Sequence, residues 1–163
     1  MTKLEREIEI DATPDRVYDV LTDPRCLGDW VTIQEELEEA PEGDLEAGSR
    51  LRQRMKVAGT RFRLSWTVVQ ADRPSRVVWE GKGPMGSKAK AIYELSGDGG
   101  GGTRFSYMNE YDLPGGPAGR IAGRAILAAS GREADRTLDR LKALVEEKAA
   151  GGGQPAPLPG PSA

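Results

Sequence analysis

Residues 103–117 carry the sequence TRFSYMNEYDLPGGP, in which a strand pattern ends and a helical pattern follows. Phe105, Tyr107, Asn109 and Tyr111 occupy alternate positions, as one face of a half-buried strand does. The Pro/Gly cluster that follows stops the sheet. From there to about residue 149 the period is helical, with Ile121, Ala125, Ala128, Leu138, Leu141 and Val145 predicted to form the apolar stripe. The sequence therefore predicts a last strand followed directly by one long helix.

The segments upstream of this stretch predict six further strands and two short helices. Residues 4–10 alternate like a half-buried strand, and Thr13-Pro14-Asp15 then suits the first turn of a helix that ends at Asp23-Pro24. A second short helix or turn is expected over residues 25–29. The remaining strands are predicted at 31–39, 50–57, 60–71, 77–79 and 88–95.

Six consecutive strands joined by hairpin-length links require antiparallel pairing. A sheet with one solvated face needs a cover on the other, and only the last helix is long enough to supply it. We therefore predict an α+β fold in which a curved seven-stranded antiparallel sheet surrounds the long C-terminal helix, with two short helices after the first strand. Residues 1–148 form the domain, and the Gly/Pro-rich residues 149–163 are expected to be a disordered tail.

The composition narrows the function. The 163 residues carry a net charge of -3, so no basic surface for nucleic acid is expected. No apolar run is long enough to span a bilayer, and residues 1–5 do not resemble a signal peptide, which favours a cytoplasmic protein. We expect a monomer or homodimer.

Histidine is absent, and Cys26 is the single cysteine. The absence of histidine excludes Ser-His-Asp and Cys-His catalysis and removes the commonest transition-metal ligand. One cysteine allows no intrachain disulfide and no thiolate zinc site. We expect no cofactor and no metal.

Several short motifs resemble those of a known superfamily. They are IEIDATP at 8–14, LTDP at 21–24 before Trp30, GTR at 102–104 and YDLPGGP at 111–117. Together they resemble the START-like, helix-grip superfamily (SRPBCC), which includes polyketide cyclases and dehydratases, and the resemblance covers about residues 3–148. It implies a helix-grip fold with a deep cavity for a hydrophobic ligand. The members include lipid and hormone binders as well as aromatase/cyclases, and fold alone does not choose among them.

A mismatch in side-chain size predicts the same cavity independently. The inward sheet residues are large, whereas the N-terminal half of the long helix is rich in Gly and Ala. Because a curved sheet stands off the helix at its centre, we expect unfilled volume there; the alternative is close packing that leaves no cavity. The predicted ligand-binding residues are Trp30, Gln53, Met55, Phe62, Leu64, Trp66, Trp79, Tyr93, Phe105, Tyr107, Asn109, Ile121, Ala125 and Ala128.

Three functions are compatible with these features. The first is binding or transport of a hydrophobic or aromatic small molecule or lipid in the cavity, which needs only shape and a few polar contacts. The second is a polyketide cyclase, aromatase or dehydratase, in which Tyr107, Asn109 and then Tyr93 are the candidate catalytic residues, with Tyr or Arg groups donating hydrogen bonds to a developing enolate. The third is a protein-interaction module without a ligand.

Overall fold

A computed structural model describes residues 2–112 and 115–152, with side chains throughout except at residues 2, 117–123, 126, 127 and 152. The elements occur in the predicted order, with two short helices between the first and second strands. They are β1 (Thr2–Ile10), α1 (Pro14–Leu21), η1 (Pro24–Cys26), α2 (Leu27–Trp30), β2 (Gln34–Glu39), β3 (Arg50–Val57), β4 (Thr60–Asp72), β5 (Arg76–Lys82), η2 (Pro84–Gly86), β6 (Lys88–Gly97), β7 (Thr103–Asp112) and α3 (Gly116–Gly152).

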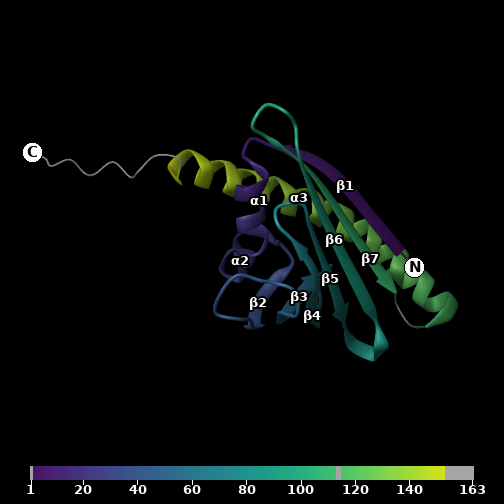
Figure 1. The fold of residues 1–163 in the computed structure, drawn as a ribbon. Helices are drawn as coiled ribbons and strands as arrows, with labels where there is room; N and C mark the ends of the chain where they lie inside the picture. The colour runs from purple at the N-terminus through teal and green to yellow at the C-terminus, as the bar shows by residue number, and fades with distance from the viewer. Residues whose placement is uncertain (1, 113–114, 153–163) are drawn as a thin grey trace, which may run out of the picture.

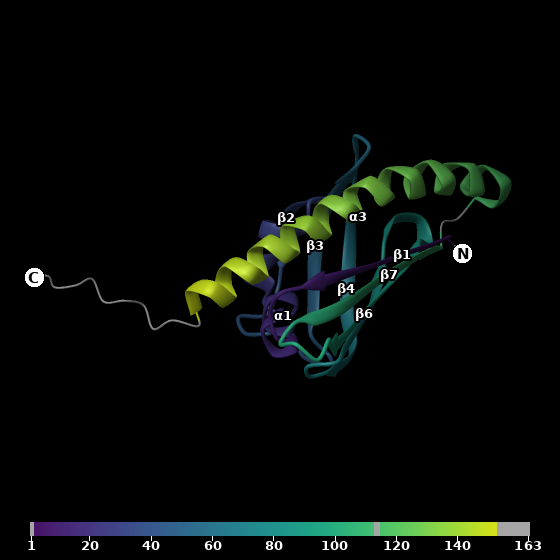
Figure 2. The same cartoon turned by 90° about the horizontal axis from the view of Figure 1, so that it is seen from above.

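The seven strands form one sheet in the order β1-β7-β6-β5-β4-β3-β2, and every neighbouring pair is antiparallel. Strands β2 to β7 are a meander, and β1 pairs with the last strand along its whole length, from Thr2 opposite Tyr111 to Ile10 opposite Thr103. The strands turn strongly from one edge of the sheet to the other, and α3 crosses the face that they enclose (Figure 1, Figure 2). The predicted helix-grip architecture is confirmed.

The sheet buries one face because its inward residues alternate with outward charges. In β3, for example, Leu51, Gln53, Met55 and Val57 are buried between exposed or half-buried Arg and Lys side chains. The outward arginines pair with acidic residues of β2; Arg63 of β4, for example, lies 2.9 Å from a carboxylate oxygen of Glu38. Such exposed pairs stabilise the fold by only about 0.2–1 kcal/mol each, so burial of the inner face holds the sheet against α3.

The apolar core includes the C-terminal half of α3. Leu138, Leu141 and Val145 of α3 are fully buried there, in one cluster with side chains of β1, α1 and β7. Helix α1 contributes the stripe predicted from its sequence, namely Val17, Tyr18, Val20 and Leu21. Burying one such aliphatic side chain stabilises a fold by roughly 1.5–3 kcal/mol, so this end of α3 is firmly fixed to the sheet.

Three predicted boundaries differ from the observed ones. β2 begins at Gln34 rather than at residue 31, because backbone hydrogen bonds from Val31 to Leu27 and from Gln34 to Val31 continue the turn after α2. β5 is longer than residues 77–79 and includes Gly81. α3 continues through Gly152, beyond the predicted end of the domain at residue 148; residues 153–163, which make up the rest of the predicted tail, lie outside the described range.

Within residues 2–112 and 115–152, no helix is both long and apolar enough to cross a membrane.

Candidate functional site: a cavity between the sheet and the long helix

A cavity of about 300 Å³ lies between the inner face of the sheet and the middle of α3. This volume is at the lower end of the range of small-molecule pockets, roughly 300–1,000 Å³. Its walls come from the strands, from the segment around α2 and from one face of α3. The lining residues are Leu4, Leu27, Trp30, Val31, Ile33, Gln53, Met55, Val57, Thr60, Arg61, Phe62, Leu64, Trp66, Trp79, Pro84, Ser87, Lys88, Ala89, Ala91, Tyr93, Tyr107, Asn109, Tyr111, Ser130, Glu133, Ala134 and Thr137.

The cavity exists because α3 changes the size of its inward side chains along its length. Ser130, Ala134 and Thr137 are buried and small, and they follow one another at the spacing of a single helix face. On the same face, one turn further on, Leu138 and Leu141 are large and fill the core. The sheet rings therefore meet bulky partners at one end of the helix and leave a space opposite the small side chains.

Ten of the predicted ligand-binding residues line this cavity. They are Trp30, Gln53, Met55, Phe62, Leu64, Trp66, Trp79, Tyr93, Tyr107 and Asn109. All ten belong to the sheet or to α2, where alternation or position after the short helices indicated the inward direction. Their role in binding stays a prediction.

The predictions on α3 were wrong where the structure can be compared with them. Ala125 and Ala128 are exposed and do not line the cavity. At 3.6 residues per turn, Ala125 lies about half a turn away from the inward position Ala134, so it points to the opposite side of the helix. The side chain of Ile121 lies outside those that the structure describes.

Phe105 is a further correction. Its side chain is fully buried, but it does not line the cavity. The ring packs edge-on against Tyr93 and Tyr107, with centroid distances of 5.6 and 6.5 Å. It thus supports the cavity wall from behind and belongs to the apolar core.

The helix side of the site was not predicted from the sequence; it consists of Ser130, Glu133, Ala134 and Thr137. A signal for three of these residues was present. Counting back from Leu138 and Leu141 in steps of three and four residues leads to Thr137, Ala134 and Ser130. Tyr111, whose large inward side chain was visible in the strand pattern, also lines the cavity.

A cluster of aromatic rings forms the sheet wall. Tyr93 is at its centre, stacked on Tyr107 at 5.5 Å between ring centroids and tilted against Trp79 at 6.1 Å. Trp30 contacts Tyr93 edge-on at 6.3 Å, and Trp66 contacts Trp79 edge-on at 6.4 Å. Such pairs stabilise one another by about 0.5–1.5 kcal/mol beyond their burial, which makes this wall rigid.

The indole N–H groups of this wall differ in their hydrogen bonding. Trp66 Nε1 donates to Gln53 Oε1 at 2.8 Å, and Gln53 in turn donates to Gln34. The buried Nε1 atoms of Trp30 and Trp79 have no acceptor among the described residues. An unpaired buried donor costs about 1–3 kcal/mol, so these two N–H groups are unused hydrogen-bonding capacity in the wall.

Three tyrosine hydroxyls belong to the same site. Burial raises the pKa of Tyr107 to about 12, opposed in part by a hydrogen bond with the Asn109 amide. Burial also raises the pKa of Tyr111 and raises that of Tyr93 well above its usual value. All three phenols are therefore protonated near neutral pH. They can donate hydrogen bonds, but they cannot act as general bases.

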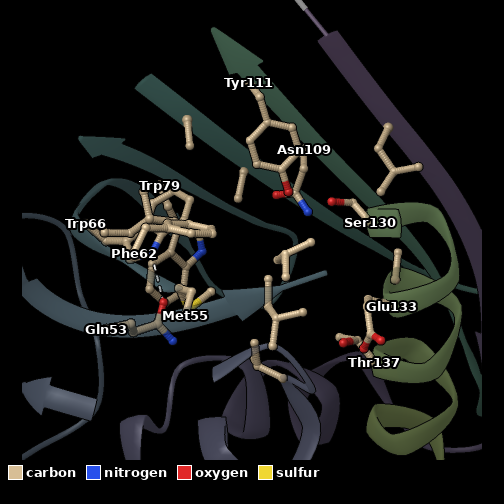
Figure 3. Close-up of a pocket in the computed structure, with 18 of the residues that line it drawn as sticks. Gln53, Met55, Phe62, Trp66, Trp79, Asn109, Tyr111, Ser130, Glu133 and Thr137 are labelled. Carbon is tan, nitrogen blue, oxygen red and sulfur yellow. Dashed lines mark hydrogen bonds between the residues drawn. The ribbon is translucent and has the colours of Figure 1, made fainter. Parts of the chain in front are cut away.

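The helix side is fixed to the segment after α2 by a small hydrogen-bond network. Thr32 Oγ1 donates to Glu133 Oε2 at 2.7 Å and lies 2.9 Å from Thr137 Oγ1, which also accepts from the Thr32 backbone N–H at 3.1 Å. Figure 3 shows Glu133 and Thr137 beside one another on α3, across the cavity from the tryptophans. Glu133 is the one acidic residue among the described lining residues.

The described residues contain no group of three or more His, Cys, Asp or Glu side chains that could hold a metal ion. The cavity can thus do two things with its own groups. It can enclose an apolar molecule, and it can donate hydrogen bonds to that molecule from indole, phenol and amide groups.

Known structures show the same fold. The Zhui aromatase/cyclase from a Streptomyces species superposes with a TM-score of 0.78 at 17% identity, covering 94% of this chain and 99% of that one. A protein from Thermus thermophilus gives a TM-score of 0.72 at 22% identity, covering 91% of this chain and 99% of that one. The Aha1 dimer from Colwellia psychrerythraea gives 0.61 at 18% identity, with 90% and 97% covered.

At these identities the structural likeness shows the fold alone. A search of curated proteins returned no match. The family model described as "Polyketide cyclase / dehydrase and lipid transport" matches residues 1–146, which include every strand and the lining face of α3. The chain is therefore a member of the polyketide cyclase/dehydrase and lipid transport family.

Proposed function

We propose that the protein binds an apolar, aromatic small molecule in the cavity between the sheet and α3. The observation that carries the proposal is the cavity itself, about 300 Å³ in volume and walled mainly by apolar and aromatic side chains. Filling a space of this kind removes ring surface from water on both sides, which stabilises the complex by roughly 25 cal/mol per Å² of apolar area. The family description, which includes lipid transport, supports the proposal.

The volume favours a compact ligand. About ten water molecules would occupy 300 Å³ in the liquid, at roughly 30 Å³ each. A molecule of two or three fused rings fits such a space, whereas a lipid with two long acyl chains would extend far outside it. The aromatic wall around Tyr93 also suits rings better than flexible chains, because rings packed against it lose little conformational freedom.

Intrinsic fluorescence provides a direct test of this function. All three tryptophans of the chain, Trp30, Trp66 and Trp79, line the cavity, so a ligand there must change their emission. We expect 2-isopropenylnaphthalene, an apolar bicyclic probe, to quench the tryptophans saturably, and native mass spectrometry to show one probe per chain.

A pair of matched variants locates the binding. Ala134→Phe places a ring in the cavity and should weaken binding at least about tenfold, because an overfilled site costs 1–3 kcal/mol or excludes the probe. Ala125→Phe makes the same change on the exposed side of α3 and should leave the affinity unchanged. Absence of saturable quenching in the unmodified protein, or equal loss in both variants, would contradict the proposal.

A second candidate is an enzyme of the cyclase or dehydratase type. It is favoured by a specific arrangement, in which protonated phenols and the Asn109 amide on β7 face the carboxylate of Glu133 across one cavity. Donors could stabilise a developing enolate while a carboxylate accepts a proton.

An assay of turnover of a poly-β-keto substrate tests this second candidate function. We expect Tyr107→Phe to abolish turnover if the protein is such an enzyme. Tyr18→Phe is the matched control, because Tyr18 is buried in α1, packs under Arg73 and does not line the cavity. Unchanged turnover in Tyr107→Phe would show that the Tyr107 hydroxyl has no catalytic role.

A further inference from the structure

The Asn109 side chain is buried and lines the cavity with hydrogen-bonding groups that a ligand could use. It is 6% exposed and lies on β7, where its neighbours on the inward face are Tyr107 and Tyr111. An amide offers two N–H donors and an oxygen with two lone pairs. The Tyr107 hydroxyl lies near enough to the Asn109 amide for the amide to offset some of the rise that burial causes in the pKa of Tyr107, and such a contact uses only part of this capacity. Buried polar groups are nearly always paired, so the remaining capacity of Asn109 requires an explanation.

Two further polar groups meet Asn109 in the same corner of the cavity. Figure 3 shows the Asn109 amide pointing toward the Ser130 hydroxyl of α3, and Tyr111, two residues further along β7, lines the same cavity. We call Asn109, Tyr111 and Ser130 the polar corner. Ser130 is buried, and burial raises the pKa of Tyr111, so its phenol keeps its proton and can donate. All three residues therefore offer hydrogen-bond donors to the same small volume.

The rest of the cavity has the opposite character. Met55, Phe62, Trp66 and Trp79 form an apolar wall on the other side of the space, away from the polar corner (Figure 3). A ligand that satisfies both regions has a flat apolar body and an oxygen acceptor at one end. A pure hydrocarbon would leave the donors of the corner unpaired and desolvated, at a cost for each group.

The charge of that acceptor also follows from the site. Among the described lining residues the cations are Arg61 and Lys88, and both are exposed. Arg61 already pairs with Glu35 at 2.9 Å. A carboxylate in the polar corner would thus be buried without a counter-ion, which is expensive, whereas a neutral carbonyl oxygen accepts two hydrogen bonds with no such cost.

We propose that the polar corner is a binding subsite for one neutral carbonyl oxygen, and that the cavity's ligand is an aryl ketone or a related aryl carbonyl compound with its rings against the apolar wall of Met55, Phe62, Trp66 and Trp79. This inference rests on the proposed binding function and adds to it the chemical class and the orientation of the ligand.

The test uses two probes of the same shape. 2-Acetylnaphthalene and 2-isopropenylnaphthalene differ only in a carbonyl oxygen where the second has a methylene group. We expect the protein to bind the ketone about 3- to 10-fold more tightly, which corresponds to one or two net hydrogen bonds. Asn109→Leu and Tyr111→Phe, which remove polar atoms with little change of shape, should each reduce this ratio toward one.

Ser130→Ala and Ser87→Ala provide a matched pair. Both hydroxyls are buried and line the cavity, but Ser87 Oγ already donates to the Pro84 carbonyl at 2.8 Å. Only Ser130→Ala should lower the ketone-to-alkene ratio. The carbonyl stretch of bound 2-acetylnaphthalene, measured by infrared difference spectroscopy on the unmodified protein, should also shift to lower wavenumber than in hexane.

The outcomes separate this inference from the function on which it rests. Equal affinity for the two probes, or a carbonyl stretch as in hexane, overturns the subsite and leaves cavity binding intact. An equal loss for both probes in Asn109→Leu likewise overturns the subsite, because the residue would then act through shape. Binding of neither probe overturns both proposals.

Discussion

Gly81→Ala tests whether the position of the Trp66 ring in the cavity wall depends on the glycine beneath it. Gly81 of β5 pairs with Trp66 of β4, and the indole ring covers the glycine. A Cβ atom at position 81 would lie 2.8 Å from Cε3 and 2.9 Å from Cζ3 of that ring. Because ordinary carbon contacts begin near 3.4 Å, the ring would have to withdraw by about 0.6 Å.

The direction of that withdrawal sets its cost. Trp79 packs against Trp66 at 6.4 Å between ring centroids, and Gln53 Oε1 accepts a hydrogen bond from Trp66 Nε1 at 2.8 Å. Because Trp66 lines the cavity, a ring pushed away from position 81 would strain both contacts and enter the cavity. Overpacking of this kind costs about 1–3 kcal/mol, and weakening the indole hydrogen bond adds about 0.5–1.5 kcal/mol. Replacing a strand glycine with alanine also stabilises the fold by about 0.5–1 kcal/mol, because the unfolded chain loses conformational freedom. We expect a net destabilisation of about 0.5–4 kcal/mol.

Urea unfolding followed by circular dichroism measures this change as a lower midpoint at constant slope. Gly97→Ala is the control, because Gly97 lies at the end of β6 and a Cβ atom added there would have no other atom within 4 Å. It should change stability by less than about 0.5 kcal/mol. If Gly81→Ala unfolds at the same urea concentration as the unmodified protein, or if adding Trp66→Leu fails to relieve its cost, then the glycine is not required by the ring.

Two further predictions follow from buried polar groups. Burial raises the pKa of Tyr107 to about 12, so between pH 10 and about 12 the unfolded chain loses this proton while the folded protein keeps it. The free energy of unfolding should therefore not depend on Tyr107 below pH 10, and it should fall as the pH rises from 10 to about 12. Absorbance at 295 nm should show its phenolate only above about pH 11, and a midpoint near 10 in the folded protein would contradict the burial effect. Thr137→Val leaves the Thr32 N–H without its acceptor, while the Thr32 hydroxyl keeps Glu133, and should cost about 1–3 kcal/mol in urea unfolding. Thr67→Val on the outer face of β4 should cost less than about 0.5 kcal/mol.

The sheet could be predicted from the sequence because a strand has an exact period of two. Once Phe105 and Tyr107 were assigned to one face of β7, the inward direction of Asn109 and Tyr111 followed without further information. Burial, by contrast, does not imply contact with the cavity. Phe105 has the same register as Tyr107 but lies where large residues of α3 close the core.

The helix face could not be fixed by the same reasoning. The N-terminal half of α3 contains so many Gly and Ala residues that a small side chain occurs on every face, and the apolar stripe is therefore ambiguous there. Ala125 fitted a loose helical spacing but is half a turn out of phase with Ala134. The large residues Leu138 and Leu141 are the reliable reference for the phase, because only one face of α3 can bury them.

Contacts between distant segments were beyond the sequence pattern. The clash that a side chain at Gly81 would make depends on its pairing with Trp66 across the β4–β5 register. The meeting of Asn109 with Ser130 depends on the phase of α3 over β7. Neither the register nor the phase is encoded in local periodicity, since both are set by how the elements pack.

The small residues of α3 at the cavity lower the stability of the fold, and they also provide the space in which a ligand can bind. A closed, dry cavity of 300 Å³ would cost about 7 kcal/mol relative to a filled core, at roughly 24 cal/mol per Å³. Whole domains are stable by only about 5–15 kcal/mol, so the space is a substantial cost even if water offsets part of it. We therefore expect Ala134→Phe to raise the melting temperature of the ligand-free protein while it weakens binding of 2-isopropenylnaphthalene. In the unmodified protein, the same probe at about 100 times its Kd should raise stability by about 2.7 kcal/mol. If Ala134→Phe lowered the melting temperature as well as the affinity, the ring would not fit the space, and the cavity would be smaller than the one described.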